Sequence, residues 1–157
     1  MTAIRPATAE DFAAIEPLWT KLYRAQVEQG MVLRLPERAY DDWVLALRPH
    51  LGRFACLFVA EEKDVSGFLA GRMRPLPRHL GGETAGYISE VFVRETLRGQ
   101  GTGKRLVDAA ILWFEERSVT RVELNVAVRN TRGKRFYERL GFVEDQSQMV
   151  LTRPRSP

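Results

Sequence analysis

The sequence predicts a single α/β domain, and three observations lead to that prediction. The chain has 157 residues, which suits one well-packed core better than two. Short apolar runs typical of strands alternate with longer segments whose apolar residues recur at helical spacing. A glycine-rich turn lies between one such strand and the helical segment that follows it. We expect the domain to occupy residues 1–157, with residues 152–157 forming a frayed tail.

Composition argues against several classes of partner. Hydrophobic residues make up 45% of the chain and charged residues 28%, as in ordinary globular domains. No apolar run approaches the about 20 residues that a membrane span needs, so no membrane is expected as a partner. The net charge of +4 permits an anionic ligand. Because the basic residues are spread out and accompany no recognised binding module, no nucleic acid is expected.

The few cysteine and histidine residues limit which disulfides, reactive thiols and metal sites the chain can form. Cys56 is the single cysteine, which excludes an internal disulfide, and its apolar surroundings predict a buried, unreactive thiol. Only His50 and His79 are present, and no set of partners around them suits a zinc site, so no metal is expected. Residues 1–6 lack the apolar core of a signal peptide, which predicts a cytoplasmic protein.

The N-terminal part of the chain is expected to form one short strand and two helices. Residues 3–5 are the strand candidate, and Thr8 begins a helix-capping pattern. Apolar residues at helical spacing then predict an amphipathic helix that ends at Gly30, with a kink or break at Pro17. A second helix is expected over residues 36–47.

The middle of the chain is expected to supply most of the sheet. Residues 53–60 are almost continuously apolar, as in a strand buried on both faces. A charged turn separates them from a strand candidate at residues 65–73, so the two should form a hairpin. An irregular loop rich in proline and glycine, residues 75–82, leads to residues 87–93, which we expect to be the central strand.

The last part of the chain returns to the alternation of helix and strand. Gly141 stands where a left-handed residue commonly ends a helix. The expected elements are a helix over 104–117, a strand over 121–126, a helix over 131–140, and terminal strands at 142–143 and 149–151.

The turn at residues 98–104 reads Arg-Gly-Gln-Gly-Thr-Gly-Lys and predicts a phosphate site. A turn that opens a helix leaves several backbone N–H groups unpaired at the positive end of the helix dipole. Glycines let a ligand approach that backbone closely. We therefore expect a phosphorylated cofactor here.

Two common phosphate-binding motifs fail at specific positions. A nucleotide-hydrolase P-loop needs glycine where Arg98 stands and serine or threonine where Arg105 stands. A dinucleotide-binding fingerprint needs a glycine at the position of Lys104 or of Leu106.

The turn instead resembles the pyrophosphate-binding turn of the GNAT superfamily, the acetyl-CoA-dependent N-acetyltransferases. Arg98, Gly101 and Gly103 meet the family pattern Arg/Gln-x-x-Gly-x-Gly/Ala. Downstream, Asn130 and then residues 136–142, Phe-Tyr-Glu-Arg-Leu-Gly-Phe, resemble the family's second signature in the same order and at a suitable separation. The resemblance covers most of the chain.

This resemblance implies a fold, a cofactor and a binding mode. The fold would be a central mixed, mostly antiparallel sheet flanked by helices, and the cosubstrate would be acetyl-CoA, with no metal. The sheet would open at residues 125–126 to receive the pantetheine arm. Gly133 departs from the alanine that many members carry, which weakens its helix. The implied cofactor-binding residues are Phe92, Val93, Arg98, Gly99, Gln100, Gly101, Thr102, Gly103, Asn130 and Tyr137.

Two side chains are candidates for acid–base chemistry. Glu90 is a carboxylate within an otherwise apolar strand, which is costly unless it is partnered or useful. It is either the general base that deprotonates the acceptor amine, directly or through water, or a carboxylate satisfied by a neighbouring Arg or Thr. Tyr137 is either the acid that protonates the departing thiolate or a residue that only packs on the cofactor.

The expected function is acetyl transfer from acetyl-CoA to an amine by direct attack in a ternary complex. A relative with another acyl group or an oxygen nucleophile, and a CoA-binding sensor without turnover, remain open. The acceptor would be a small-molecule or peptide amine. Dimerisation is common in the family, so a homodimer is compatible with the resemblance. Trp19, Tyr23, Tyr40 and Trp43 are expected in the core or on a dimer surface, with one or two lining the acceptor pocket.

Overall fold

The computed structural model describes residues 1–157, and its five strands form one sheet. Three neighbouring strand pairs are antiparallel, and only the last pair is parallel. The expected mixed, mostly antiparallel sheet is therefore confirmed. The strands lie in the sheet in chain order as β1 (Ala3–Pro6), β2 (Ala55–Glu61), β3 (Val65–Pro75), β4 (Thr84–Val93) and β5 (Val122–Leu124), so β3 and not β4 is central.

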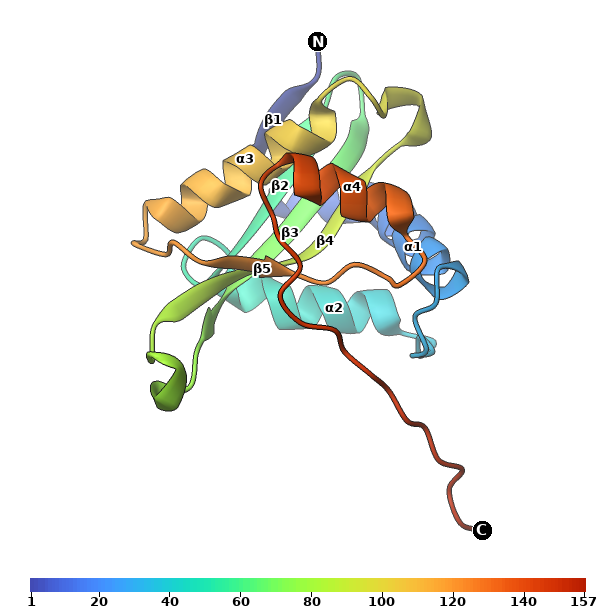
Figure 1. Cartoon of the computed structure of the whole chain (residues 1–157). Helices are drawn as coiled ribbons and strands as arrows, with labels where there is room; N and C mark the ends of the chain where they lie inside the picture. The colour runs from blue at the N-terminus through green and yellow to red at the C-terminus, as the bar shows by residue number, and fades with distance from the viewer.

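Four α-helices cover the two faces of this sheet (Figure 1). On one face lie α1 (Phe12–Glu28) and α2 (Ala39–Leu47), and on the other lie α3 (Thr102–Glu115) and α4 (Thr131–Arg139). Single 3-10 turns occupy Ala9–Asp11, Arg48–His50, Arg78–Leu80 and Glu95–Leu97. None of the helices combines the length and the apolar character that crossing a bilayer requires.

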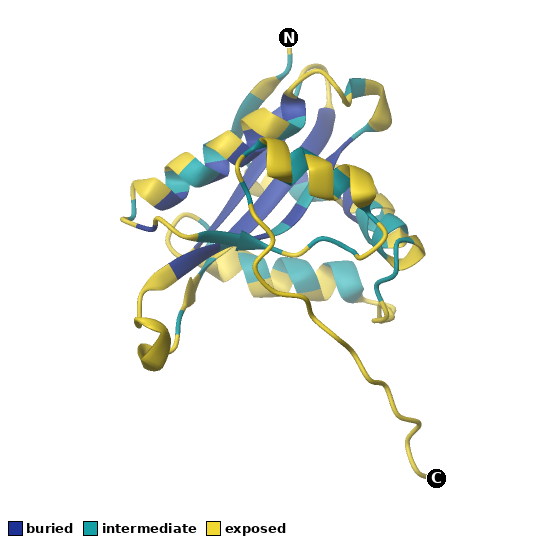
Figure 2. Cartoon of the chain, in the orientation of Figure 1, coloured by how far each residue is buried: buried dark blue, intermediate teal, exposed yellow.

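Two apolar clusters lie above and below the sheet, and the buried residues follow its strands (Figure 2). The cluster under α3 includes Leu106 and Phe114, and the cluster under α1 includes Ile15 and Phe68. Cys56 lies in the first cluster, where burial raises the pKa of its thiol to about 12. The predicted burial of this thiol is therefore confirmed.

The ring of Phe114 rests directly on the sheet because Gly86 has no side chain. A Cβ atom added to Gly86 would lie 2.8 Å from Cδ2 and Cε2 of that ring. Phe114 has no exposed surface, so neither group has room to move aside. A glycine in a strand commonly marks such a close approach.

Pro17 does not break its helix, so of the expected kink or break the break does not occur. The helix α1 runs without interruption, with Pro17 in its first half. The proline lacks the N–H that would bond to the carbonyl of Ala13, but both residues are exposed. Water can therefore satisfy that carbonyl. The second helix begins at Ala39, later than predicted.

The prediction of terminal strands at residues 142–143 and 149–151 is wrong. Residues 142–157 form no helix or strand, and Figure 1 shows the end of the chain running away from the domain. The last strand, β5, has only three residues, so its outer edge offers little backbone for a further strand to pair with. The first part of the segment is held instead by an ion pair between Asp145 and Arg121, at 2.6 Å.

Candidate active site

The parallel strands β4 and β5 separate after a short stretch of pairing. Residues 86–88 of β4 pair with residues 122–124 of β5, and no pairing follows. Residues 89–93 of β4 therefore leave one edge without a neighbouring strand. The resemblance to the family implied that the sheet opens at residues 125–126, and the pairing ends immediately before them.

A bulge at Ser89 determines where Glu90 points. The register between β3 and β4 skips Ser89, so this residue is the extra one of a β-bulge. In a regular strand Ile88 and Glu90 would point to the same face. Here Ile88 packs in the cluster under α3, whereas Glu90 accepts a hydrogen bond from Tyr23 on α1. The bulge thus directs the carboxylate to the face that α1 and α2 cover.

Glu90 is buried and has a donor on each carboxylate oxygen. Its exposed fraction is 4%. The Tyr23 hydroxyl donates to Oε1 at 2.7 Å, and the Ser89 hydroxyl donates to Oε2. Burial raises the pKa of Glu90, while Ser89, Tyr23, Trp43 and Arg72 oppose that rise by stabilising the ionised form. The expected partners were Arg or Thr, and the hydrogen-bonding partners are instead a tyrosine and a serine.

The turn before α3 presents a row of unpaired backbone donors. Among the backbone N–H groups around the turn, Arg98 donates to Glu95 and Arg105 donates to Gly101. The N–H groups of residues 99–104 have no acceptor in the protein. Because Gly99 and Gly101 have φ of +79° and +81°, the turn bends in a way that other residues rarely adopt. This cradle fits an anion such as a pyrophosphate.

The side chain of Arg98 turns back toward β4. Its Nε donates to the carbonyl of Val93 at 2.9 Å, and its guanidinium lies over the ring of Phe92. Its backbone N–H is also used within the protein. The unpaired backbone N–H groups of the turn therefore begin at Gly99, one residue later than the sequence suggested. Arg98 fixes the end of β4 relative to the turn.

Asn130 caps α4. Its Oδ1 accepts a hydrogen bond from the N–H of Gly133 at 2.9 Å. A Cβ atom on Gly133 would lie 2.4 Å from Nδ2 of Asn130. The glycine that stands in place of alanine therefore makes room for the capping side chain.

The other end of α4 positions Tyr137. The N–H of Phe142 donates to the carbonyl of Tyr137, and that of Gly141 to the carbonyl of Glu138. These two bonds, with Gly141 at φ of +95°, form a Schellman motif. The rings of Tyr137 and Phe142 pack edge to face. Burial raises the pKa of Tyr137 to about 12, and its hydroxyl has no hydrogen-bond partner in the protein.

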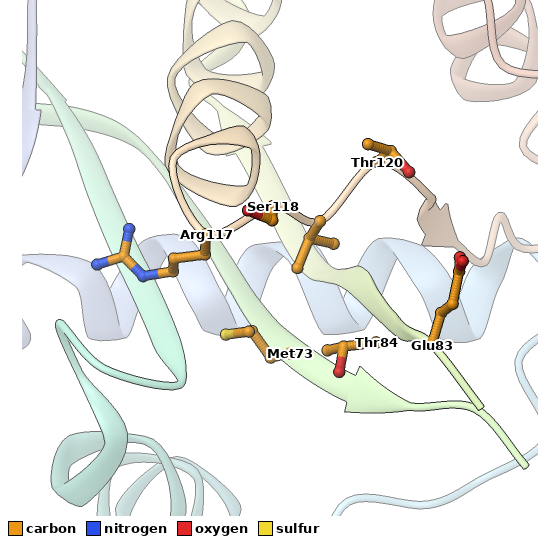
Figure 3. Close-up of a pocket in the computed structure, with 7 residues that line it drawn as sticks. Met73, Glu83, Thr84, Arg117, Ser118 and Thr120 are labelled. Carbon is orange, nitrogen blue, oxygen red and sulfur yellow. The ribbon is translucent and has the colours of Figure 1, made fainter.

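A separate cavity of about 300 Å³ lies at the far end of α3 (Figure 3). It is bordered by Met73 and Thr84 from the β3–β4 hairpin and by residues 117–120, which follow α3. The glycine turn precedes the opposite end of the same helix. This cavity is therefore distinct from the candidate active site.

Sequence reasoning did not find the contact between Tyr23 and Glu90. These residues are 67 positions apart, and no local motif links them. The sequence places Tyr23 only among four aromatic residues on the first two helices. The Ser89 bulge also leaves no signal in the apolar pattern of its strand.

Comparison with known proteins agrees with this geometry. A sequence profile described as the acetyltransferase (GNAT) family matches residues 12–142. An uncharacterised N-acetyltransferase of Methanocaldococcus jannaschii is 33% identical over 143 residues, which are 91% of this chain and 61% of that protein. The matches cover 61% and 55% of the lengths of the two curated relatives, so this chain corresponds to only part of each.

Solved structures share the same fold. A tetramutant of a Bacillus halodurans protein has a TM-score of 0.80 and 28% identity, with 96% of this chain and 99% of that chain covered. A predicted acetyltransferase of Clostridium acetobutylicum, solved with acetyl-CoA, has a TM-score of 0.75, with 97% and 96% covered. At 19% identity, this second likeness concerns the fold alone. The family profile matches most of the chain, including the glycine turn and the place where the sheet opens. The chain therefore belongs to the GNAT family of acetyltransferases.

Proposed function

We propose that this protein transfers an acetyl group from acetyl-CoA to an amine. The observation that carries the proposal is the row of unpaired N–H groups at residues 99–104, which lies at the end of the strand whose edge is open. Family membership and the acetyl-CoA held by the Clostridium acetobutylicum neighbour support the same cosubstrate.

The turn would hold the pyrophosphate and the open edge of β4 would hold the pantetheine arm. Phe92 and Val93 were expected to pair with that arm. The N–H of Arg94 donates to Ser66 on β3. Because the N–H groups of successive residues along a strand point to opposite edges, those of Val93 and Val91 face the open side, whereas that of Phe92 faces β3. The amide N–H groups of Asn130 and the hydroxyl of Tyr137 are not used within the protein, and both would bind the same cosubstrate.

Glu90 and Tyr137 would supply the proton transfers. An amine near the reference pKa of about 10.4 must lose a proton before it attacks the thioester, and Glu90 is the base that would take it. The backbone N–H of Val91, on the open side of the strand, would polarise the thioester carbonyl, whereas that of Phe92 faces β3. Tyr137 would donate a proton to the departing thiolate. Bound acetyl-CoA supplies the activated acetyl group, and the transfer would be direct.

The acceptor in this proposal is a small-molecule or peptide amine, and we infer a cytoplasmic protein that is compatible with a homodimer. The single buried thiol supports a reducing compartment. Cell fractionation tests the location, and light scattering tests the oligomeric state.

A thiol-release assay with acetyl-CoA and a panel of amines tests the function, with wild type beside Glu90→Gln. We expect turnover on at least one amine, which the variant loses or shows only at higher pH. CoA binding without turnover on any acceptor, and indifference to Glu90→Gln, would contradict acetyl transfer and favour a CoA-binding sensor.

A further inference from the structure

Tyr23 is the more accessible partner of the buried carboxylate. Glu90 is 4% exposed, and each of its oxygens already accepts a hydrogen bond. Tyr23 is only partly buried. Its hydroxyl uses its single proton in the bond to Glu90, at 2.7 Å, so its oxygen lone pairs remain able to accept. An acceptor amine that approaches this face therefore meets the phenol oxygen more readily than the carboxylate.

Packing on α1 holds the phenol in this position. The ring of Tyr23 lies 4.4 Å from the ring of Trp19, centroid to centroid. Trp19 is itself buried in the core on this face. The rings of Trp43 and Tyr40 lie within 6.1 Å of the Trp19 ring and complete the aromatic cluster. The hydroxyl is thus held by a rigid helix and not by a loop.

We propose that Tyr23 is a proton relay through which Glu90 deprotonates the acceptor amine. This inference rests on the proposed function. The N–H bond of the ammonium breaks as its proton passes to the oxygen of Tyr23. In the same step the phenol's own proton passes to Oε1 of Glu90. The products are a neutral amine, an unchanged tyrosine and a protonated Glu90, so protons and charge balance.

The charged and titratable groups around this pair favour the relay. Arg72 on β3 favours the ionised form of Glu90, and Tyr87 on β4 also faces the pair. Burial and the negative charge of Glu90 raise the pKa of Tyr23 well above its ordinary range. A free phenolate is therefore not formed, and the phenol loses its proton only as it gains another. Burial also makes Glu90 a stronger base than an exposed carboxylate.

The test compares Tyr23→Phe with Tyr40→Phe. Both variants lose one hydroxyl from the same aromatic cluster, but the Tyr40 hydroxyl donates to the carbonyl of Phe12 and not to Glu90. We expect Tyr23→Phe to lower kcat by about 100-fold with little change in KM for acetyl-CoA. The acid limb of its pH profile should move upward, because a hydrogen bond that stabilises ionised Glu90 is lost. Tyr40→Phe should keep the wild-type profile.

A proton inventory in mixtures of H2O and D2O separates the relay from simple positioning. Wild type should show two protons in motion and Tyr23→Phe one. If the inventory is the same in both, the relay is wrong. An unchanged kcat and acid limb in Tyr23→Phe would overturn it as well.

A measurement that needs no turnover tests the contact between Tyr23 and Glu90 independently of the proposed function. Carbon-13 NMR of labelled glutamate follows the titration of Glu90 in wild type and in Tyr23→Phe, with Glu90→Gln to assign the signal. We expect the pKa of Glu90 to be higher in Tyr23→Phe. If the titration does not move, Tyr23 does not control Glu90, whatever the fate of the acetyltransferase assignment.

Discussion

Glu90 and Tyr137 lie on opposite faces of the sheet. Glu90 reaches Tyr23 on the face that α1 and α2 cover, whereas Tyr137 packs against the cluster under α3. Between the two faces, the sheet is open only where β4 has lost β5 as its neighbour. A base and an acid that serve one thioester must therefore act on it from either side of this opening. The amine would enter from the face of α1, and the thiolate would leave toward α4.

Replacing Tyr137 with phenylalanine should slow the reaction without stopping it. A thiolate is already a fair leaving group, so we expect kcat to fall by about tenfold, with KM for acetyl-CoA changed by less than about twofold. Because burial raises the pKa of Tyr137 to about 12, this phenol stays protonated in the usual assay range. Any alkaline limb below that pH should persist in Tyr137→Phe. Its disappearance would show that Tyr137 titrates earlier.

The phosphate cradle can be tested with two glycines of matched conformation. Gly101 and Gly52 have φ of +81° and +83°, and an added Cβ would meet no atom within 4 Å at either position. Alanine at each should cost about 1 kcal/mol of stability through backbone strain alone. Only Gly101→Ala should weaken CoA binding, by about tenfold on calorimetry, because relieving the strain turns the peptide groups of the turn. Equal CoA affinity in the two variants would show that the turn at residues 99–104 does not hold the pyrophosphate.

Asn130 and Gly133 should show strong coupling in stability. Alanine for glycine inside a helix normally stabilises it by about 1 kcal/mol. Here the new Cβ would displace the Asn130 cap, which is itself worth about 1 kcal/mol. We expect Gly133→Ala alone to give no net gain and the same change in an Asn130→Ala background to stabilise. Urea unfolding of the four proteins measures the coupling, and additive effects would contradict it.

Gly86→Ala should be strongly destabilising for a different reason. Its Cβ would lie 2.8 Å from the Phe114 ring in a core without free space. We expect a loss of about 3 kcal/mol in the free energy of unfolding. In a Phe114→Leu background the same change should cost much less, because the ring is gone. A cost that persists without the ring would place the clash elsewhere.

The pair of Arg5 and Asp11 predicts a specific loss of stability in acid. The guanidinium donates to both carboxylate oxygens, at 2.8 and 2.9 Å, and lowers the pKa of Asp11 from 3.8 to about 2. A carboxyl whose pKa is lower in the folded chain than in the unfolded chain stabilises the fold at pH values above its unfolded-state pKa. This contribution disappears as the pH falls through its folded-state pKa.

Wild type should therefore lose about 2 kcal/mol more stability than Asp11→Asn between about pH 5 and about pH 2. Urea unfolding at a series of pH values gives both curves. Parallel curves would mean that Asp11 has the same pKa in the folded and unfolded chains.

The local part of this structure was predictable from the sequence. Periodicity identified α1 and α3, and the glycine turn was recognisable because its requirements are local ones of backbone conformation and helix start. The helix-ending role of Gly141 followed from the same kind of rule. The choice between a kink and a break at Pro17 could not be made from the sequence, because exposure of the freed carbonyl depends on how the helix packs.

The non-local part could not be predicted. The contact of Tyr23 with Glu90 depends on how α1 crosses the sheet, which no local pattern encodes. The short length of β5 and the absence of strands after it depend on pairing between distant segments. Glu90 was found only because a charge in an apolar strand is conspicuous, and its partners were expected to be of other residue types.

The bulge at Ser89 has a consequence for comparing this chain with its relatives. It shifts the inward and outward alternation of β4 by one residue, so the orientation of Glu90 depends on counting as well as on residue type. A relative that has the same number of residues here but pairs without the bulge would carry an acid aligned with Glu90 on the same face as the residue aligned with Ile88. Equivalent bases in such proteins must be matched by strand register and not by column in an alignment. Deleting Ser89 alone would make the strand regular, with Glu90 directly after Ile88, and would leave the carboxylate on the face that α1 and α2 cover.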